Sequence, residues 1–289
     1  MNCSARALAK NSLLEDRREQ VGVSLVMREI NIQTVSLNEI RDSIHALRYA
    51  EEVLVIRGGA SKYSRDNWNE ILIDICLLTI DRRQYNYYEQ LQMVDWWEIS
   101  YQPDKATSYA YSNTRQPLHT DNAWFSDPAE INFFIMEKQA SAGGEQTIYR
   151  LSRLMDDLSN EQPALFEDLC HATVTIKKGD GQYFNRTSII VPGHDPKIFW
   201  NYYRTEKPTA EIQSMCDAFF QYLERKELTS SVERRRSETG DCICFNDQKI
   251  LHGRAAFSAT MPFERVLLQS MWRLPKLSPI SSDPGRSMP

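Results

Sequence analysis

The chain has 289 residues, of which 42% are hydrophobic and 25% are charged, and its formal net charge is −5. These values are typical of a globular protein with a sizeable core, arranged as one large domain or two small ones. The acidic balance argues against general nucleic-acid binding, which usually needs a basic face. No apolar run approaches the ~20 residues that span a bilayer, so we expect no membrane partner.

The six cysteines contain no CxxC pair of the kind that binds zinc or cycles between redox states. Nothing in their spacing demands disulfides, which favours a reducing compartment. The first residues lack the apolar core of a signal peptide. We therefore expect a cytoplasmic protein that acts on a small molecule and that can form a homo-oligomer.

Taken in chain order, residues 1–20 are polar and are expected to be a flexible segment, residues 21–277 form one domain, and residues 278–289 form a disordered tail rich in Ser, Pro and Gly. A capping box at Ser36 and Glu39 begins an amphipathic helix. Further helices are predicted over residues 68–78, 151–158, 161–169 and 209–225, and strands over residues 53–56, 131–136, 172–177, 197–203, 242–245 and 263–268.

Residues 81–104 are rich in Tyr, Gln and Trp and show no clear period. Such a segment lies across a pocket mouth in some proteins and is an aromatic part of the core in others. Many short strands with a few helices predict a mostly β fold with flanking helices, a distorted double-stranded β-helix or jelly roll.

The segment Pro117–Asn122 carries the main chemical signal. Successive side chains of an extended segment alternate between faces, so His119 and Asp121 share one face and can converge on one point. An imidazole and a carboxylate so placed are two thirds of the 2-His-1-carboxylate triad of non-haem Fe(II) oxygenases. The third ligand should be a distant histidine, and the chain has five histidines in all; one of them, His252, follows a predicted turn at residues 246–248.

These motifs together resemble the taurine dioxygenase (TauD/TfdA) family of Fe(II)- and 2-oxoglutarate-dependent oxygenases, over about Leu37 to Trp272. The resemblance is strongest in three segments: Leu118-His119-Thr120-Asp121, Gly143-Gly144-Glu145-Gln146-Thr147 and Leu251-His252-Gly253-Arg254-Ala255-Ala256-Phe257.

The resemblance implies a role for each matching residue. His119, Asp121 and His252 match the iron ligands, and Arg265 matches the arginine that pairs with the distal carboxylate of 2-oxoglutarate. Thr147 matches the threonine whose hydroxyl supports that carboxylate. The implied reaction consumes O2, decarboxylates 2-oxoglutarate to succinate and oxidises an unactivated C–H bond. A carboxylate at Asp121, instead of a small residue that leaves room for chloride, favours hydroxylation, desaturation or a related step over halogenation.

Two departures from the family pattern concern the binding of 2-oxoglutarate and of the substrate. Gln146 is inserted between the acidic residue of the glycine turn and Thr147, which can shift the threonine out of place. Gln269 stands where taurine-type enzymes carry an arginine for the sulfonate, so an alkyl-sulfonate substrate is disfavoured.

Three side chains are the candidates for substrate contacts: Arg115, Trp124 and Gln269. Arg115 precedes His119 by four residues and shares its face on an unbroken strand, where it can hold a substrate carboxylate. We therefore expect hydroxylation of a small carboxylate-bearing metabolite such as an amino acid. Desaturation or cyclisation in natural-product biosynthesis, a non-catalytic sensor of metal or 2-oxoglutarate, and a zinc hydrolase are the alternatives.

Overall fold

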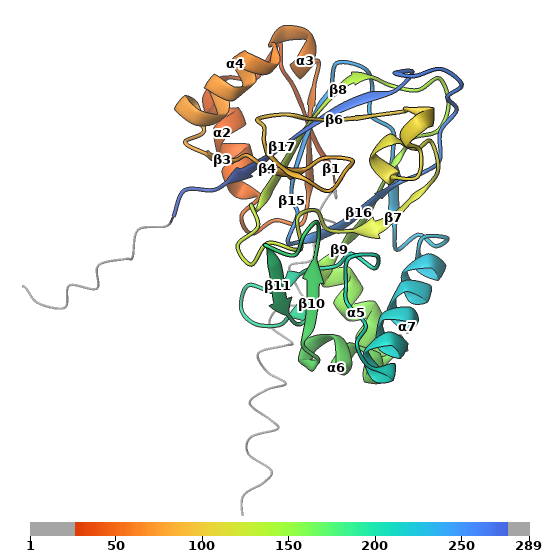
Figure 1. The fold of residues 1–289 in the computed structure, drawn as a ribbon. Coiled ribbons are helices and arrows are strands. Elements are labelled where there is room, and N and C mark those ends of the chain that lie inside the picture. The colour runs from red at the N-terminus through yellow and green to blue at the C-terminus, as the bar shows by residue number, and fades with distance from the viewer. Residues whose placement is uncertain (1–26, 277–289) are drawn as a thin grey trace, which may run out of the picture.

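Two β-sheets face each other and form the centre of the molecule (Figure 1). The computed structural model describes residues 27–276, so the segments expected to be flexible at 1–20 and disordered at 278–289 lie outside the described residues. The larger sheet has the strand order β1 (Met27–Asn31), β2 (Val53–Arg57), β15 (Cys242–Asn246), β8 (Ile131–Lys138), β17 (Val266–Arg273) and β3 (Thr79–Asp81), with β6 (Trp97–Ser100) also paired to β17.

The smaller sheet has the order β14 (Glu233–Arg235), β9 (Gln146–Arg150), β16 (Ile250–Arg254) and β7 (Gln116–His119). Three hairpins project from this framework: β4 (Arg83–Tyr85) with β5 (Leu91–Met93), β10 (Val174–Lys177) with β11 (Phe184–Thr187), and β12 (Ile190–Val191) with β13 (Lys197–Ile198).

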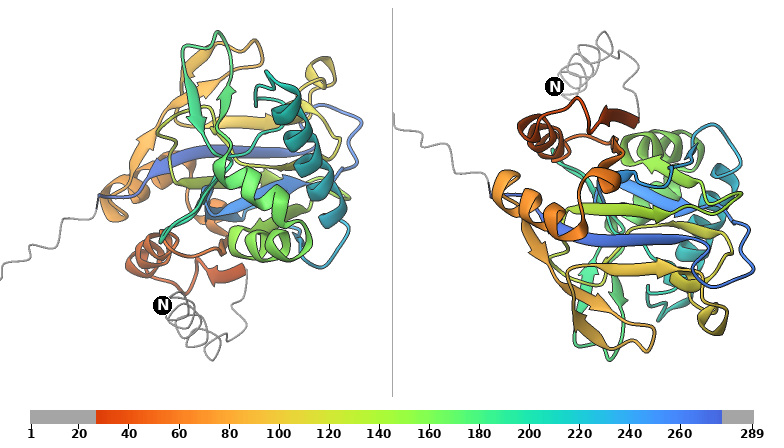
Figure 2. Two further views of the ribbon diagram at one scale, coloured as in Figure 1. Left: turned by 90° about the horizontal axis from the view of Figure 1, so that it is seen from below. Right: turned by 90° about the horizontal axis from the view of Figure 1, so that it is seen from above.

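Helices cover the outer face of each sheet, as the views in Figure 2 show. On the larger sheet lie α2 (Leu37–Ala46), α3 (Gly59–Lys62), α4 (Arg65–Glu70) and the π-helix Ile71–Ile75, and on the smaller sheet lie α5 (Leu151–Glu161), α6 (Pro163–His171) and α7 (Ala210–Lys226). Two 3₁₀ turns, Pro103–Lys105 and Tyr109–Tyr111, precede β7. No helix among residues 27–276 is both long and apolar enough to cross a membrane.

Side-chain alternation divides the core into three apolar clusters. On β8, Phe133 and Ile135 pack toward α2 and α4, whereas Phe134 and Met136 point between the sheets. On β9, Tyr149 packs toward α5–α7, whereas Ile148 points between the sheets. Residues one position apart therefore serve different layers, as the two-residue period of a strand requires.

Most predicted elements are confirmed with small shifts of their ends, but the strand expected over residues 197–203 ends at Ile198. The capping box is formed: the Ser36 hydroxyl accepts from the Glu39 N–H, and the Glu39 carboxylate accepts from the Ser36 N–H. The helix expected over residues 68–78 begins earlier, at Arg65, and ends in the π-helical turn. The mostly β architecture with flanking helices is confirmed.

Candidate metal and 2-oxoglutarate site

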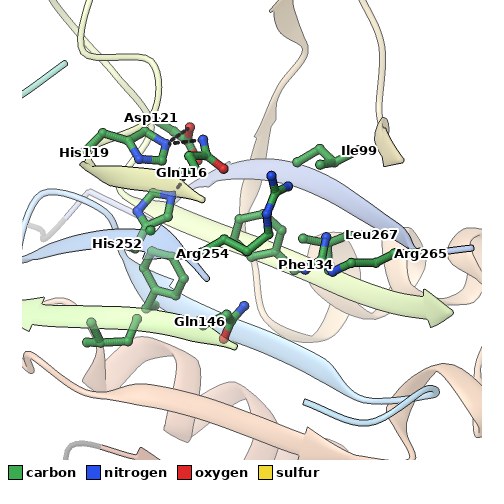
Figure 3. Close-up of a pocket in the computed structure, with 13 residues that line it drawn as sticks. Ile99, Gln116, His119, Asp121, Phe134, Gln146, His252, Arg254, Arg265 and Leu267 are labelled. Carbon is green, nitrogen blue, oxygen red and sulfur yellow. Dashed lines mark hydrogen bonds and ion pairs between the residues drawn. The ribbon is translucent and has the colours of Figure 1, made fainter. Parts of the chain in front are cut away.

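The residues His119, Asp121 and His252 meet between the two sheets, at the junction of β7 and β16. Each offers one ligand atom, and the three atoms all lie within 4.8 Å of one another. His119 Nε2 is 3.4 Å from Asp121 Oδ1, and His252 Nε2 is 3.2 Å from Asp121 Oδ2 (Figure 3). Asp121 lies in the turn directly after β7, so the convergence expected from the His-x-Asp spacing is present although the strand ends at His119.

The other ring nitrogen of each histidine is oriented by a neighbouring oxygen. His119 Nδ1 lies 2.9 Å from the Pro117 carbonyl oxygen, and His252 Nδ1 lies 3.2 Å from the Asp247 carboxylate. An oxygen at Nδ1 favours the tautomer that keeps the proton there and leaves the lone pair at Nε2. Both Nε2 atoms are then directed at the same point as the Asp121 carboxylate.

Two amides hold the Asp121 carboxylate in place. Asn132 and Gln269 donate to Asp121 Oδ2 at 2.7 and 2.6 Å, and Gln269 also donates to the Asn132 side-chain oxygen at 3.0 Å. Burial acts to raise the pKa of the Asp121 carboxyl, but the two histidines outweigh it and hold this pKa well below its usual range. The carboxylate is therefore ionised, as a metal ligand must be.

His252 is charged in the metal-free protein for the complementary reason. Burial acts to lower the pKa of His252, yet the Asp121 and Asp247 carboxylates raise it to about 10. Burial raises the pKa of Asp247 to about 6. A divalent cation can replace the proton that His252 shares with these carboxylates, since the donor set is the two imidazoles and one carboxylate that suit Fe(II).

A cavity, here called the inner cavity, extends from the triad between the sheets. Its lining includes three polar groups beside the triad, Gln146, Arg254 and Arg265, and the apolar side chains Ile99, Phe134, Ile148, Phe245 and Leu267. Figure 3 shows Arg254, Arg265 and Gln146 together with the three residues of the triad.

The two arginines are buried cations that no carboxylate of the described residues neutralises. Arg265 is 1% exposed and its Nε has no hydrogen-bond partner. Arg254 donates through Nη2 to the carbonyl oxygens of Ser112 and Thr114, but its Nε is also unpartnered. Burial lowers the pKa of Arg254 to about 10, and burial together with repulsion from Arg254 lowers that of Arg265 to about 9. Such cations are costly unless an anion joins them.

The glycine turn before β9 permits the close approach to Arg265. Gly143 and Gly144 both have φ +75°, a region that favours glycine. A Cβ on Gly143 would lie 2.2 Å from the Ala256 carbonyl oxygen, and one on Gly144 would lie 3.2 Å from Arg265 Nε. The Gly-Gly pair seen in the sequence thus lets the turn pack against the guanidinium.

Thr147 does not face the inner cavity. In β9 and β16, Gln146 pairs with Arg254 and Ile148 pairs with His252, and these four residues line the cavity. Thr147 pairs with Gly253, where a Cβ would lie 2.6 Å from the Thr147 hydroxyl, so this side chain is on the far face. Thr147 is therefore not placed for the expected contact with 2-oxoglutarate, and Gln146, the residue inserted before it, lines the inner cavity instead.

Arg115 also lies elsewhere than expected. Its guanidinium pairs with Glu224 of α7 and with Glu227, which directly follows that helix, and it lines neither the inner cavity nor the pocket described below. The reason is an irregularity in the β7–β16 pairing, where His252 pairs with His119 but Arg254 pairs with Gln116. One extra residue on β7 brings Gln116 to the face of His119, and its amide lies 3.0 Å from His119 Nε2.

A second, wider hollow, here called the outer pocket, shares His119 and Asp121 with the lining of the inner cavity. Trp124 and Gln269, two of the expected substrate contacts, do line it. So do Tyr85, Tyr87 and Trp97, which places part of the aromatic segment 81–104 at this pocket. Sequence reasoning did not single out Lys178, which also lines this pocket, because a basic residue at a hairpin turn gives no signal without the tertiary structure.

The site has the features of a non-haem iron oxygenase, and the comparisons place the chain in a family. The family model "Taurine catabolism dioxygenase TauD, TfdA family" matches residues 15–272. The chain belongs to this family, as the motifs predicted.

Individual relatives are distant. The γ-butyrobetaine dioxygenase of Pseudomonas sp. (strain AK-1) is 26% identical over 160 residues, which is 53% of this chain and 42% of that protein. The match thus spans less than half of that relative's length.

Solved structures share the fold. An asparagine oxygenase in complex with Fe(II), a hydroxyasparagine and succinate is similar with a TM-score of 0.61, 12% identity, and coverage of 81% of this chain and 79% of that one. The non-haem iron oxygenase OrfP in complex with Fe and α-ketoglutaric acid gives a TM-score of 0.58 and 14% identity, with coverage of 81% and 79%.

Proposed function

We propose that this protein is an Fe(II)- and 2-oxoglutarate-dependent oxygenase that hydroxylates an unactivated C–H bond of a small carboxylate-bearing metabolite, such as an amino acid. The observation that carries the proposal is the juxtaposition of the His119, Asp121 and His252 ligand atoms with a cavity lined by two arginines that no carboxylate of the described residues neutralises. A metal site alone fits many chemistries, but this combination fits a metal together with an anionic cosubstrate.

The residues of the site fit both an iron ion and 2-oxoglutarate. His119, Asp121 and His252 would hold the iron, which with 2-oxoglutarate and O2 supplies the oxidising power for the C–H bond. Arg265 would pair with the distal carboxylate of 2-oxoglutarate, since its planar guanidinium offers parallel donors and has no other acidic partner among the described residues. Gln146 would add an amide donor beside it, because its side chain makes no hydrogen bond within the described residues.

The other side chains orient the site and exclude water. Asn132 and Gln269 fix the Asp121 carboxylate by two donated hydrogen bonds. Apolar side chains, Phe134, Phe245 and Leu267 among them, form the remaining wall of the inner cavity and keep water from the oxidising centre. The names of the sequence relative and of the solved structures with the same fold point to the same class of substrate, because they contain γ-butyrobetaine, asparagine and arginine derivatives.

A zinc hydrolase using the same triad would leave both unpaired arginines without a role. A sensor would bind 2-oxoglutarate without making succinate, and a desaturase or cyclase would give a product without an added oxygen. The jelly-roll arrangement, a cytoplasmic location and homo-oligomerisation are further parts of the proposal that rest on the sequence.

The test is anaerobic titration of metal-free protein with Fe(II) and then 2-oxoglutarate, with detection of the weak visible charge-transfer band of the chelate. The band should appear in the wild type and in His171→Ala, an exposed histidine on α6, and should be absent in His252→Ala. Admission of air should then yield succinate. Iron binding without the band would remove 2-oxoglutarate as cosubstrate, and the band without succinate would favour a sensor.

A further inference from the structure

The outer pocket contains a pair of opposite charges that neutralise each other. Arg204 Nη2 lies 2.5 Å from Glu89 Oε1, and Glu89 Oε2 accepts from the Gly179 N–H at 3.2 Å. Glu89 belongs to the turn of the β4–β5 hairpin, and Gly179 to the turn of the β10–β11 hairpin. The pair therefore joins two hairpin turns into one wall of the pocket and adds no net charge to that wall.

Lys178 is the charge that remains in this wall. It lines the outer pocket and forms no ion pair with any carboxylate of residues 27–276. Its Nζ lies 4.6 Å from the centre of the Trp124 ring and 5.7 Å from that of Tyr85. Burial lowers the pKa of Lys178 to about 8, and Arg204 adds to this by repulsion. The side chain is thus a half-buried cation against aromatic faces, at a wall of the hollow that Asp121 and His119 also line.

The backbone holds Lys178 in this position. Gly179 has φ +65°, and a Cβ there would lie 2.4 Å from Tyr85 Cε1 and 2.8 Å from the Glu89 carbonyl oxygen. Only glycine permits the β10–β11 turn to pack so closely on Tyr85. The neighbouring Lys177 contrasts with it, since it is exposed, pairs with Glu206 and lies outside the pocket lining.

We propose that Lys178 binds the carboxylate of the substrate and that the substrate is a small amino acid or betaine. The single ammonium group of Lys178, which has no acidic partner among the described residues, suits a carboxylate that carries one negative charge. A substrate bound through its carboxylate at Lys178 would extend along the aromatic wall of the outer pocket toward the triad. The cationic nitrogen of such a zwitterion can lie against the faces of Tyr87, Tyr109 or Tyr203. This inference rests on the proposed function and adds the substrate class and its anchor.

The test is a screen of the twenty common L-amino acids and γ-butyrobetaine for stimulation of succinate release by the iron-loaded wild type. Compounds that stimulate are titrated again with Lys178→Met, Lys178→Arg and the matched control Lys177→Met, and their carboxamides are tested in parallel. Thermal melting of each variant checks that it is folded.

The half-saturating concentration should rise about 10- to 100-fold in Lys178→Met, the loss expected for one charge-assisted contact, and less in Lys178→Arg. The half-saturating concentration of 2-oxoglutarate should change far less, and Lys177→Met should match the wild type. The carboxamides should stimulate weakly or not at all.

Three results would overturn the anchor while leaving the oxygenase intact: an unchanged half-saturation in Lys178→Met, a carboxamide as effective as its acid, or basal succinate release that no compound of the panel stimulates. A wild type that gives neither succinate nor the charge-transfer band would instead remove the proposed function, and the anchor with it.

Discussion

Gln146 and Thr147 are adjacent on β9 but serve opposite sides of the smaller sheet: Gln146 lines the inner cavity, and the Thr147 hydroxyl packs against Gly253. The relationship follows from strand alternation, because one inserted residue exchanges the two faces. It places an amide beside the inner cavity, where the family resemblance predicted a hydroxyl.

This arrangement predicts different effects for two neighbouring substitutions. Gln146→Ala should raise the KM for 2-oxoglutarate about 10-fold, as removal of a hydrogen bond to a charged group does. Thr147→Val keeps the shape of a side chain that is 0% exposed and should leave this KM unchanged. Steady-state succinate release at saturating iron measures both values. A larger effect of Thr147→Val than of Gln146→Ala would restore the threonine to the site.

Arg265 is predicted to lower the stability of the metal-free protein and to be needed for binding 2-oxoglutarate. Because the metal-free protein buries this guanidinium without an acidic partner, Arg265→Met should raise its free energy of unfolding by about 1–4 kcal/mol. The same change should remove the charge-transfer band with 2-oxoglutarate while iron still binds. Urea denaturation of the metal-free protein and the anaerobic titration give the two readings. A destabilised variant that retains 2-oxoglutarate binding would contradict both expectations.

The metal ligands could be predicted from the sequence because they depend on local spacing and short motifs. His119 and Asp121 converge through an interval of two residues, and the turn before His252 is also local. The side chains that were misplaced depend on pairing between strands. Arg115 would face the metal on a regular β7, but the extra residue opposite β16 brings Gln116 there instead.

The residues of the outer pocket were even harder to predict from the sequence than the position of Arg115. Lys178 reaches it only because a glycine allows the β10–β11 turn to pack on Tyr85 of another hairpin. No pattern within residues 174–187 encodes that contact, since the partner segment is distant in the chain. Contacts between turns are set by the whole fold and are not visible in periodicity or motifs.

The amides that hold Asp121 should control metal affinity. Gln269→Leu removes a donor 2.6 Å from Asp121 Oδ2 and should weaken Fe(II) binding about 10- to 100-fold, the usual effect of losing such an outer contact. The half-saturation for 2-oxoglutarate, measured at saturating iron, should change much less. Gln213→Leu is the control, because Gln213 donates to the carboxylate of Asp217 on α7, away from the metal. Equal iron affinity in Gln269→Leu and wild type would show that Asn132 alone orients the carboxylate.

Arg115 is predicted to act on stability rather than on substrate binding. It pairs with Glu224 at the surface and with Glu227, whose side chain is 2% exposed. Arg115→Gln leaves the Glu227 carboxylate buried without this cation and should lower the free energy of unfolding by about 1–3 kcal/mol, a value reduced by the 35% exposure of Arg115 itself.

The cause can be separated from a general loss of packing. Glu227→Gln in the Arg115→Gln background removes the isolated charge and should recover part of the lost stability in urea denaturation. Stimulation by any amino acid that activates the wild type should keep its half-saturating concentration in Arg115→Gln. A rise in that concentration comparable to the rise in Lys178→Met would return Arg115 to the substrate site and would mean that α7 moves when substrate binds.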